Sequence, residues 1–145
     1  MPQVRDILEK KGTQVWTVGP QATVMQAATL MNEYKIGALV VTDAGRIIGM
    51  FTERDVLRRV VGEHRDPLTT LVADVMTTEV LCCTPRTLLE EARTVMKERR
   101  IRHLPVSDDD GRLLGLISIG DLNAYQTSDH EYTIYMLQEY LYGRV

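Results

Sequence analysis

The sequence predicts an α/β (α+β) fold made of two similar halves, each with the order strand, helix, strand, strand, helix, followed by a C-terminal helix. Three observations predict this fold. The sequence repeats internally, the helical and strand patterns recur in the same order in both copies, and 145 residues suit one compact unit. Because two copies are too few to stack as a solenoid, we expect the halves to close on each other and bury each other's apolar faces.

The repeat becomes visible when the sequence is shifted against itself by 65 positions. Identical residues then coincide at Val15/Val80, Pro20/Pro85, Ala27/Ala92, Met31/Met96, Ile36/Ile101, Leu39/Leu104 and Val41/Val106. The second copy has one inserted residue, in the turn Asp108–Gly111 opposite Asp43–Gly45, and a shift of 66 aligns the positions that follow. The two β-α-β-β-α repeats are therefore expected to be pseudo-symmetric.

A shorter similarity, between Val4–Leu8 and Val72–Met76, precedes the two copies, and we call residues 1–11 and 72–77 the lead-in segments. The chain is expected to divide into a first repeat with its lead-in (1–61), a linker (62–71), a second repeat with its lead-in (72–128) and a helical tail (129–145). The linker is polar and contains Pro67, which is typical of a connection.

The first strand and first helix follow from local patterns. Gln14–Val18 is a short β-branched run that a Gly-Pro pair ends, which predicts a strand. Thr23 and Gln26 have capping-box spacing ahead of apolar residues at helical spacing, which predicts a helix. Thr87 and Glu90 have the same spacing in the second copy, although the two caps are one position out of register.

A β-hairpin and a second helix complete each copy. The hairpin strands are predicted at Ala38–Val41, Arg46–Phe51, Leu104–Val106 and Leu113–Ser118. Each pair of strands flanks a turn that contains Asp and Gly, as hairpins favour. Helices are expected over Asp55–Val61 and Asp121–Tyr125, and the spacing of Met136 and the neighbouring tyrosines predicts the tail helix.

Composition and charge exclude several classes of protein. With 17 Lys+Arg against 20 Asp+Glu the net charge is −3, which does not suit a basic nucleic-acid binder. Apolar stretches such as Ala38–Val41 are far shorter than the roughly 20 residues of a membrane span. Met1–Lys10 does not resemble a leader, and the adjacent Cys82 and Cys83 form neither a staple nor a CxxC metal site. We therefore expect a cytoplasmic protein with no nucleic-acid or membrane partner and no metal.

Two Ser/Thr-x-x-Asp motifs, Thr52 to Asp55 and Ser118 to Asp121, stand at expected strand-to-helix junctions. One interpretation is structural, since this spacing forms a capping box. The other is functional: the carboxylate accepts two hydrogen bonds from a ribose 2′,3′-diol, and the hydroxyl contacts sugar or phosphate. The residues alone leave both interpretations open, and the two roles can coexist.

Four pieces of sequence carry a family resemblance: Asp74–Thr77, Gly49–Asp55, Gly115–Asp121 and Arg99–Val106. Together, in register within a duplicated chain, they make residues 4 to about 125 resemble a tandem pair of CBS domains, the regulatory Bateman module. The resemblance implies a short, stand-alone regulatory protein that binds adenosine ligands in clefts between the repeats. It also implies that the Ser/Thr and Asp of both motifs hold the ribose.

The resemblance places further residues in the clefts. Arg102 and His103 would meet phosphates, although a charged run at a helix end is the alternative. Gly37 and Ala38 take the equivalent places in the first repeat, where small residues let a ligand approach the backbone. Arg54 has a glycine as its counterpart. The two clefts are therefore chemically different, and we expect unequal affinities.

Two other residues are weaker candidates. Trp16 lies in the first strand, where the family lets residues flank the adenine, but a single Trp is more often part of a core or an interface. Lys11 could reach a phosphate from the lead-in, whereas an ordinary solvated lysine is the simpler explanation.

The sequence thus predicts a regulatory module that binds an adenine nucleotide, with AMP ranked ahead of NAD(H), ADP and ATP. S-adenosylmethionine ranks lower, because its sulfonium gains nothing beside Arg102. No P-loop, nucleophile elbow or dinucleotide fingerprint occurs, so no catalytic residue is predicted. The alternatives are an interaction module whose clefts stay empty and, outside these two, an enzyme acting on a nucleotide. The expected partners are a second copy, through the apolar face of the tail, and an unidentified regulated protein.

Overall fold

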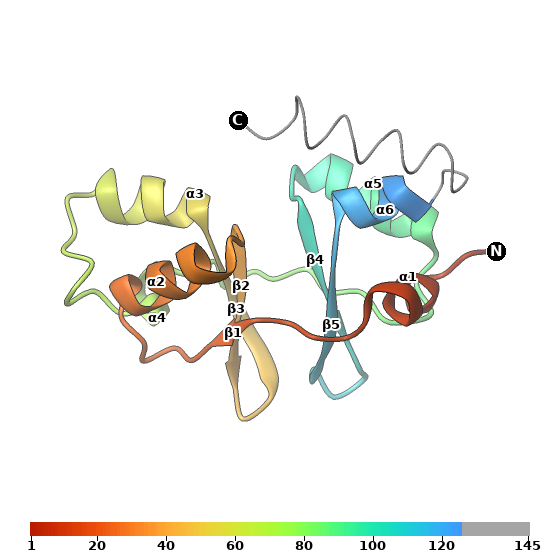
Figure 1. Ribbon diagram of the computed structural model, residues 1–145, viewed down its shortest axis with the longest axis horizontal. Helices are drawn as coiled ribbons and strands as arrows, with labels where there is room; N and C mark the ends of the chain where they lie inside the picture. The colour runs from red at the N-terminus through yellow and green to blue at the C-terminus, as the bar shows by residue number, and fades with distance from the viewer. Residues whose placement is uncertain (126–145) are drawn as a thin grey trace.

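The computed structural model describes residues 1–125. Its two halves lie side by side, with their strands toward the middle (Figure 1). The elements are α1 (Val4–Lys11), β1 (Thr17–Val18), α2 (Val24–Tyr34), β2 (Ala38–Asp43), β3 (Arg46–Thr52), α3 (Glu53–Asp55), the π-helical η1 (Val56–Val61), α4 (Val72–Val75), α5 (Leu89–Arg99), β4 (His103–Ser107), β5 (Leu113–Ser118) and α6 (Ile119–Tyr125). The predicted mixed α+β class is confirmed, whereas the expected tail helix at 129–145 lies outside the described residues.

Each repeat has its own small sheet, and the hairpin strands of the two sheets pair at equivalent positions. β2 and β3 pair antiparallel with Ala38 opposite Thr52, and β4 and β5 pair antiparallel with His103 opposite Ser118. β1 adds a parallel strand beside β2. Both hairpin turns contain a glycine at φ +81°, a left-handed conformation that glycine adopts at no steric cost. The predicted hairpins are confirmed.

The second repeat lacks a full counterpart of β1. In the first repeat the Val40 N–H donates to the Trp16 carbonyl at 3.4 Å. The residue that corresponds to Val40 in the second repeat is Pro105, which has no N–H to donate. Within residues 1–125, a single bridge between Cys83 and Val106 takes the place of the strand. The first strand expected in the second copy is therefore reduced to a bridge, because a proline removes one hydrogen bond of the ladder.

The predicted helix start is correct in one copy and wrong in the other. Thr23 caps α2, since the Gln26 N–H donates to Thr23 Oγ1 (3.1 Å) and the Thr23 N–H donates to Gln26 Oε1 (2.9 Å). Thr87 instead accepts a hydrogen bond from the Thr84 N–H at 3.0 Å, and α5 begins later, at Leu89. Thr87 thus closes the turn ahead of the helix and does not cap it.

The second helix of the first repeat also differs from its prediction. It begins at Glu53, two residues early, and continues over Val56–Val61 as a π-helix. The wide last turn closes when the Gly62 N–H donates to the Leu57 carbonyl at 2.8 Å. A Cβ at Gly62 would lie 2.9 Å from the Arg58 carbonyl oxygen, so the glycine permits this ending.

The lead-in segments are exchanged between the repeats. α1 precedes the first repeat in sequence, but Val4, Ile7 and Leu8 are buried in the apolar core of the second. In return, Val72 and Val75 of α4 are buried in the core of the first. Figure 1 shows α1 beside β5 and α6, and α4 beside α2. At about 1.5–3 kcal/mol for each fully buried aliphatic side chain, these contacts are a large part of each core.

Backbone hydrogen bonds hold the two exchanged lead-in segments in equivalent ways. The Val4 N–H donates to the Thr87 carbonyl, ahead of α5, at 2.8 Å. Likewise, the Val72 N–H donates to the Ala22 carbonyl, ahead of α2, at 2.8 Å. Each lead-in is therefore joined to the start of the other repeat's first helix.

Two glycines at matching positions let the lead-ins cross the hairpin strands. A Cβ at Gly49 would lie 2.5 Å from Met76 Sδ and 3.0 Å from the Thr77 carbonyl oxygen. A Cβ at Gly115 would lie 2.8 Å from Leu8 Cδ2. Real Cβ atoms do not approach other atoms so closely, and a side chain at either position would push the lead-in away from its strand.

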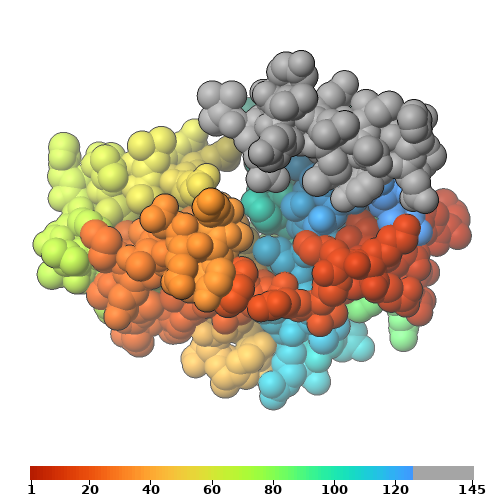
Figure 2. Space-filling view, in the orientation of Figure 1, coloured from red at the N-terminus to blue at the C-terminus, as the bar shows by residue number. Residues whose placement is uncertain are grey.

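The two sheets meet in a third, smaller apolar cluster. Ala38, Val40 and Met50 are buried there, with side chains of β5 packed against them. At one edge the hairpin tips touch (Figure 2), and the Ile47 N–H donates to the Gly111 carbonyl at 3.0 Å. The repeats therefore contact each other through this cluster and through the hairpin tips.

The crossing at Gly49 predicts a stability effect. Replacing Gly49 with Ala should lower the free energy of unfolding by about 1–3 kcal/mol, because the methyl group overpacks the contact with Met76 and the Thr77 backbone. Gly19, which has no atom within 4 Å of its ideal Cβ, provides the control, and Gly19→Ala should leave stability within about 1 kcal/mol. Urea denaturation measures both, and equal stability of the two variants would contradict the crossing.

Candidate functional site

Both Ser/Thr-x-x-Asp motifs lie at the edge of the molecule opposite the hairpin tips. Thr52 ends β3 and Ser118 ends β5, and a helix begins directly after each. The strand register places Ala38 beside Thr52 and His103 beside Ser118. The fold therefore brings the predicted residues of each repeat to the same strand ends.

The structural interpretation of both motifs is confirmed. The Thr52 N–H donates to Asp55 Oδ2 (3.0 Å), and the Asp55 N–H donates to Thr52 Oγ1 (3.3 Å). The Ser118 N–H donates to Asp121 Oδ2 (2.8 Å), and the Asp121 N–H donates to Ser118 Oγ (3.1 Å). Each capping box uses one carboxylate oxygen, so the other oxygen determines what else the motif can bind.

The second oxygen of Asp55 is enclosed by protein. Thr77 Oγ1 donates to Asp55 Oδ1 at 3.3 Å, and Arg59 Nε lies 3.6 Å from the same oxygen. The Asp55 side chain is only 8% exposed. Arg59 is itself held, because its Nη1 donates to the Met76 carbonyl at 3.0 Å. A ligand that reached this carboxylate would have to displace Thr77 or Arg59.

Asp121 is more accessible. Its side chain is 23% exposed, and Lys11 Nζ lies 2.8 Å from Oδ2, the oxygen that also serves the cap. Lys11 Nζ donates in addition to the Leu116 carbonyl at 2.9 Å. Within residues 1–125, no group donates to Asp121 Oδ1. Among the described residues, this motif therefore has an acceptor oxygen without a donor, beside an ammonium group.

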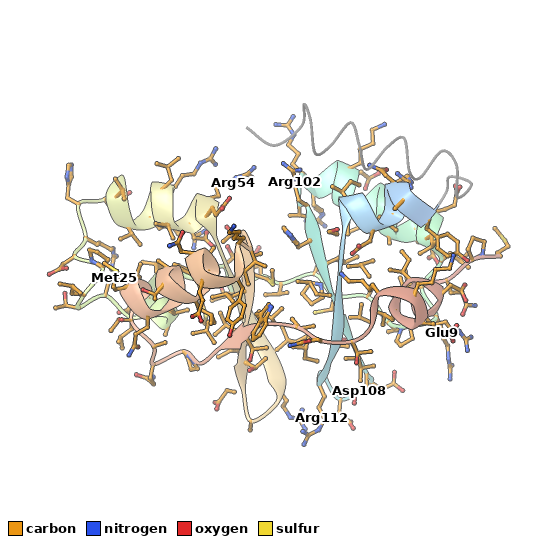
Figure 3. All side chains as sticks on the ribbon, viewed as in Figure 1. Glu9, Met25, Arg54, Arg102, Asp108 and Arg112 are labelled. Carbon is orange, nitrogen blue, oxygen red and sulfur yellow. The ribbon has the colours of Figure 1, made fainter. Side chains whose placement is uncertain are left out.

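Two arginines from opposite repeats lie near these motifs. Arg54 belongs to α3, Arg102 precedes β4, and Figure 3 shows both at the edge opposite the hairpin turn of Arg112. Both side chains are exposed. Because guanidinium groups bind phosphate oxygens with paired hydrogen bonds, the two repeats together present anion-binding groups along this edge.

The space beside Gly37 is filled by the chain itself. The Glu53 N–H donates to the Gly37 carbonyl at 3.0 Å, and a Cβ on Gly37 would lie 3.2 Å from the Glu53 carboxylate. The corresponding bond of the second repeat runs from the Ile119 N–H to the Arg102 carbonyl, also at 3.0 Å. The backbone arrangement is thus shared, while the side chains differ in charge between the repeats.

Trp16 is partly buried against the core of the first repeat. Its ring stacks on Tyr34 of α2, with centroids 3.7 Å apart and planes at 17°. One face of the indole is therefore occupied by a side chain of the same repeat.

Comparison with known proteins identifies the family. The CBS domain model matches residues 4–62 and again residues 72–127. This chain is a tandem pair of CBS domains. The resemblance seen in the sequence is confirmed, and the two matched ranges cover most of the chain.

Similar proteins support the same conclusion. The CBS domain-containing protein YhcV of Bacillus subtilis is 38% identical over 129 residues, which cover 89% of this chain and 89% of that protein. The crystal structure of the CBS-domain containing protein ATU1752 from Agrobacterium tumefaciens superposes with a TM-score of 0.80 at 40% identity, covering 87% of this chain and 100% of that one. The CBS domain pair of protein MJ0100 has a TM-score of 0.76 at 21% identity, covering 86% and 95%, and shares the fold.

In this CBS pair the surroundings of His103 are electropositive. Burial lowers the pKa of the imidazole below its ordinary value, and the positive charges of Arg102 and Lys11 lower it further. The negative charges of Asp121 and Glu53 raise the pKa of His103, but they do not outweigh these effects. His103 is therefore mainly neutral near pH 7, and a bound anion would favour its protonated form.

A cavity of about 440 Å³ lies next to Arg102 on the side of α5. Its lining consists of apolar and basic side chains: Arg93, Met96, Lys97, Arg100, Ile101, Arg102 and Ile119. Neither motif carboxylate lines this cavity, so a ribose held on Asp55 or Asp121 would lie outside it.

Sequence reasoning missed the groups that surround the first motif. Thr77 and Arg59 on Asp55, and Glu53 beside Gly37, carry no local pattern that predicts these contacts. Within the described part of the chain, no three His, Cys, Asp or Glu side chains are grouped to hold a metal, and no helix is long and apolar enough to cross a membrane.

The position of His103 predicts a pH dependence of stability. The pKa of His103 in the folded chain is below the unfolded value of about 6.5. At a pH between these two pKa values, the unfolded state therefore binds more protons than the folded state. The free energy of unfolding should therefore fall as the pH is lowered from about 7 to 5. Urea denaturation of His103→Gln should show a smaller fall than the wild type, whereas the exposed-site control His64→Gln should match it. An unchanged pH dependence in His103→Gln would contradict this account.

Proposed function

We propose that this CBS pair is a regulatory module that binds an adenine nucleotide, AMP ahead of NAD(H), ADP or ATP, with the ribose on Asp121. The observation that carries the proposal is a partly exposed carboxylate whose Oδ1 accepts no hydrogen bond from residues 1–125, with Lys11 on its other oxygen. A carboxylate accepts the hydrogen bonds of a ribose diol, and Lys11, Arg102 and His103 offer donors for phosphate.

The family supports an adenosine ligand. The MJ0100 pair was crystallised in complex with 5′-methylthioadenosine and S-adenosyl-L-methionine, which share the adenosine group. For this chain we rank AMP above S-adenosylmethionine, because a sulfonium is repelled by the charges of Lys11 and Arg102, whereas a phosphate is attracted by them.

We assign a weaker affinity to the Asp55 motif. There the ligand must displace Thr77 from Oδ1, and the carboxylate is nearly fully buried. Arg54 is an exposed cation one residue before Asp55, while Gly37 is covered by Glu53. The ligand roles of Gly37, Ala38, Thr52, Arg54 and Trp16 remain predictions.

The proposed role is regulatory and not catalytic. The similar proteins reported above are CBS domain proteins, and this likeness supports the regulatory role. The regulated protein and a cytoplasmic location remain predictions. An interaction module with empty clefts is the competing function, and ligand binding distinguishes the two.

Loss of the Asp121 charge should weaken nucleotide binding. We expect AMP to raise the melting temperature of the wild type, and Asp121→Asn to weaken AMP binding about ten- to a hundredfold, the effect of losing a charged hydrogen-bond acceptor. Calorimetry measures the affinity, and Asp109→Asn, an exposed hairpin aspartate, removes the same charge elsewhere. Asp55→Asn should weaken AMP binding less than Asp121→Asn. No thermal response to AMP, ADP, ATP, NAD or NADH would favour the interaction module.

We also propose that the protein is a homodimer. The apolar tail that first suggested it lies outside the described residues, but the first repeat exposes other apolar side chains. Leu57 and Val61 of η1 are 64% and 61% exposed, and Leu68 of the linker is 66% exposed. The Met25 N–H donates to the Pro67 carbonyl, so α2 and the linker meet at this side. Such a surface favours a two-fold contact with a second copy.

Light scattering tests the dimer. The wild type should have twice the 16.5 kDa mass of one chain. The double variant Leu57→Glu, Val61→Glu should shift it toward a monomer, because two charges would be buried in the contact. Leu114→Glu, a partly exposed site in the second repeat, is the control and should leave the dimer intact. A wild-type mass of 16.5 kDa would contradict the proposal.

A further inference from the structure

The two motifs differ in the group that the opposite lead-in brings to them. Asp121 receives an ammonium group, Lys11 Nζ at 2.8 Å, from the end of α1. Asp55 receives a neutral hydroxyl, Thr77 Oγ1 at 3.3 Å, from the segment after α4. The pseudo-symmetric exchange thus delivers a cation to one motif and an uncharged donor to the other.

Because Asp121 is paired with an ammonium group, a ligand that binds there must offer Lys11 a new anionic partner. Lys11 Nζ and the Ser118 N–H already occupy Asp121 Oδ2, so a ribose diol that engages both carboxylate oxygens must displace the ammonium. Ribose hydroxyls are neutral and do not replace the lost ion pair. A phosphate on the same ligand does, because it offers Lys11 a new anionic acceptor.

The Lys11 side chain can move from the Asp121 carboxylate to a bound phosphate. Its side chain is 37% exposed and carries three donors on a flexible stem, of which two are directed at Asp121 Oδ2 and the Leu116 carbonyl. The neighbouring positive charge of Arg102 would attract the same phosphate, and so would His103 when its imidazole is protonated. Glu53 is the acidic group that opposes them from the first repeat.

We propose that Lys11 is the specificity-determining residue of the Asp121 motif, and that it makes this motif select phosphorylated adenosines over adenosine. This inference rests on the proposed function, namely that the ribose of an adenine nucleotide binds to Asp121. It adds the residue that sets the preference for a phosphorylated adenosine over the nucleoside.

Calorimetric titration of the full chain with AMP and with adenosine tests the proposal. The wild type should prefer AMP, and Lys11→Met should reduce the ratio of the two affinities at least tenfold, through weaker AMP binding with adenosine unchanged or tighter. Lys11→Arg should retain most of the preference, because it keeps the charge. Lys10→Met is the matched control: Lys10 Nζ lies 5.0 Å above the Tyr125 ring, and this variant should keep the wild-type ratio.

Four outcomes would overturn the proposal. If Lys11→Met weakened AMP and adenosine equally, Lys11 would only hold α1 in place. If the ratio did not change, Lys11 would not contact the phosphate. If the wild type bound AMP and adenosine equally well, the inference would fail while the proposed function stood, whereas binding of neither ligand would remove the proposed function itself. Melting temperatures of all variants confirm that they are folded.

Discussion

The exchange of lead-in segments is the constraint on which the rest of this CBS pair depends. α1 completes the core of the second repeat, and α4 completes the core of the first. Each exchange requires a close crossing over a hairpin strand, and the crossings occur at Gly49 and Gly115, where a Cβ would meet Met76 or Leu8. Neither repeat therefore has a complete core of its own, and the halves are expected to fold as one cooperative unit.

The same exchange builds the candidate sites. Each motif combines a strand end of one repeat with a group carried by the lead-in of the other: Lys11 on Asp121, and Thr77 on Asp55. A ligand that displaces Lys11 acts directly on the last residue of α1, and so on the packing between the repeats. A regulatory function fits this arrangement, because binding at the site and contact between the repeats share the same residues.

Features that depend on neighbouring residues could be predicted from the sequence, whereas contacts between distant residues could not. Hairpins and the motif junctions were predictable, because turn glycines and Ser/Thr-x-x-Asp spacing act within a few residues. The exchange was not, because the apolar pattern of Val4–Leu8 shows that a face is buried without showing which repeat buries it. The loss of the first strand in the second repeat could have been predicted from Pro105, which has no N–H for the ladder. The contact between Lys11 and Asp121 joins residues 110 positions apart, and only the fold brings them together.

A crystal structure of the full chain grown with AMP tests the central claim most directly. Our account predicts the nucleotide at the strand ends of the second repeat, with its ribose hydroxyls on the Asp121 carboxylate and its phosphate among Lys11, Arg102 and His103. An AMP molecule bound only at Asp55, or in the cavity beside α5, would contradict that assignment. Clefts that stay empty at saturating AMP would contradict nucleotide binding as the function of this CBS pair.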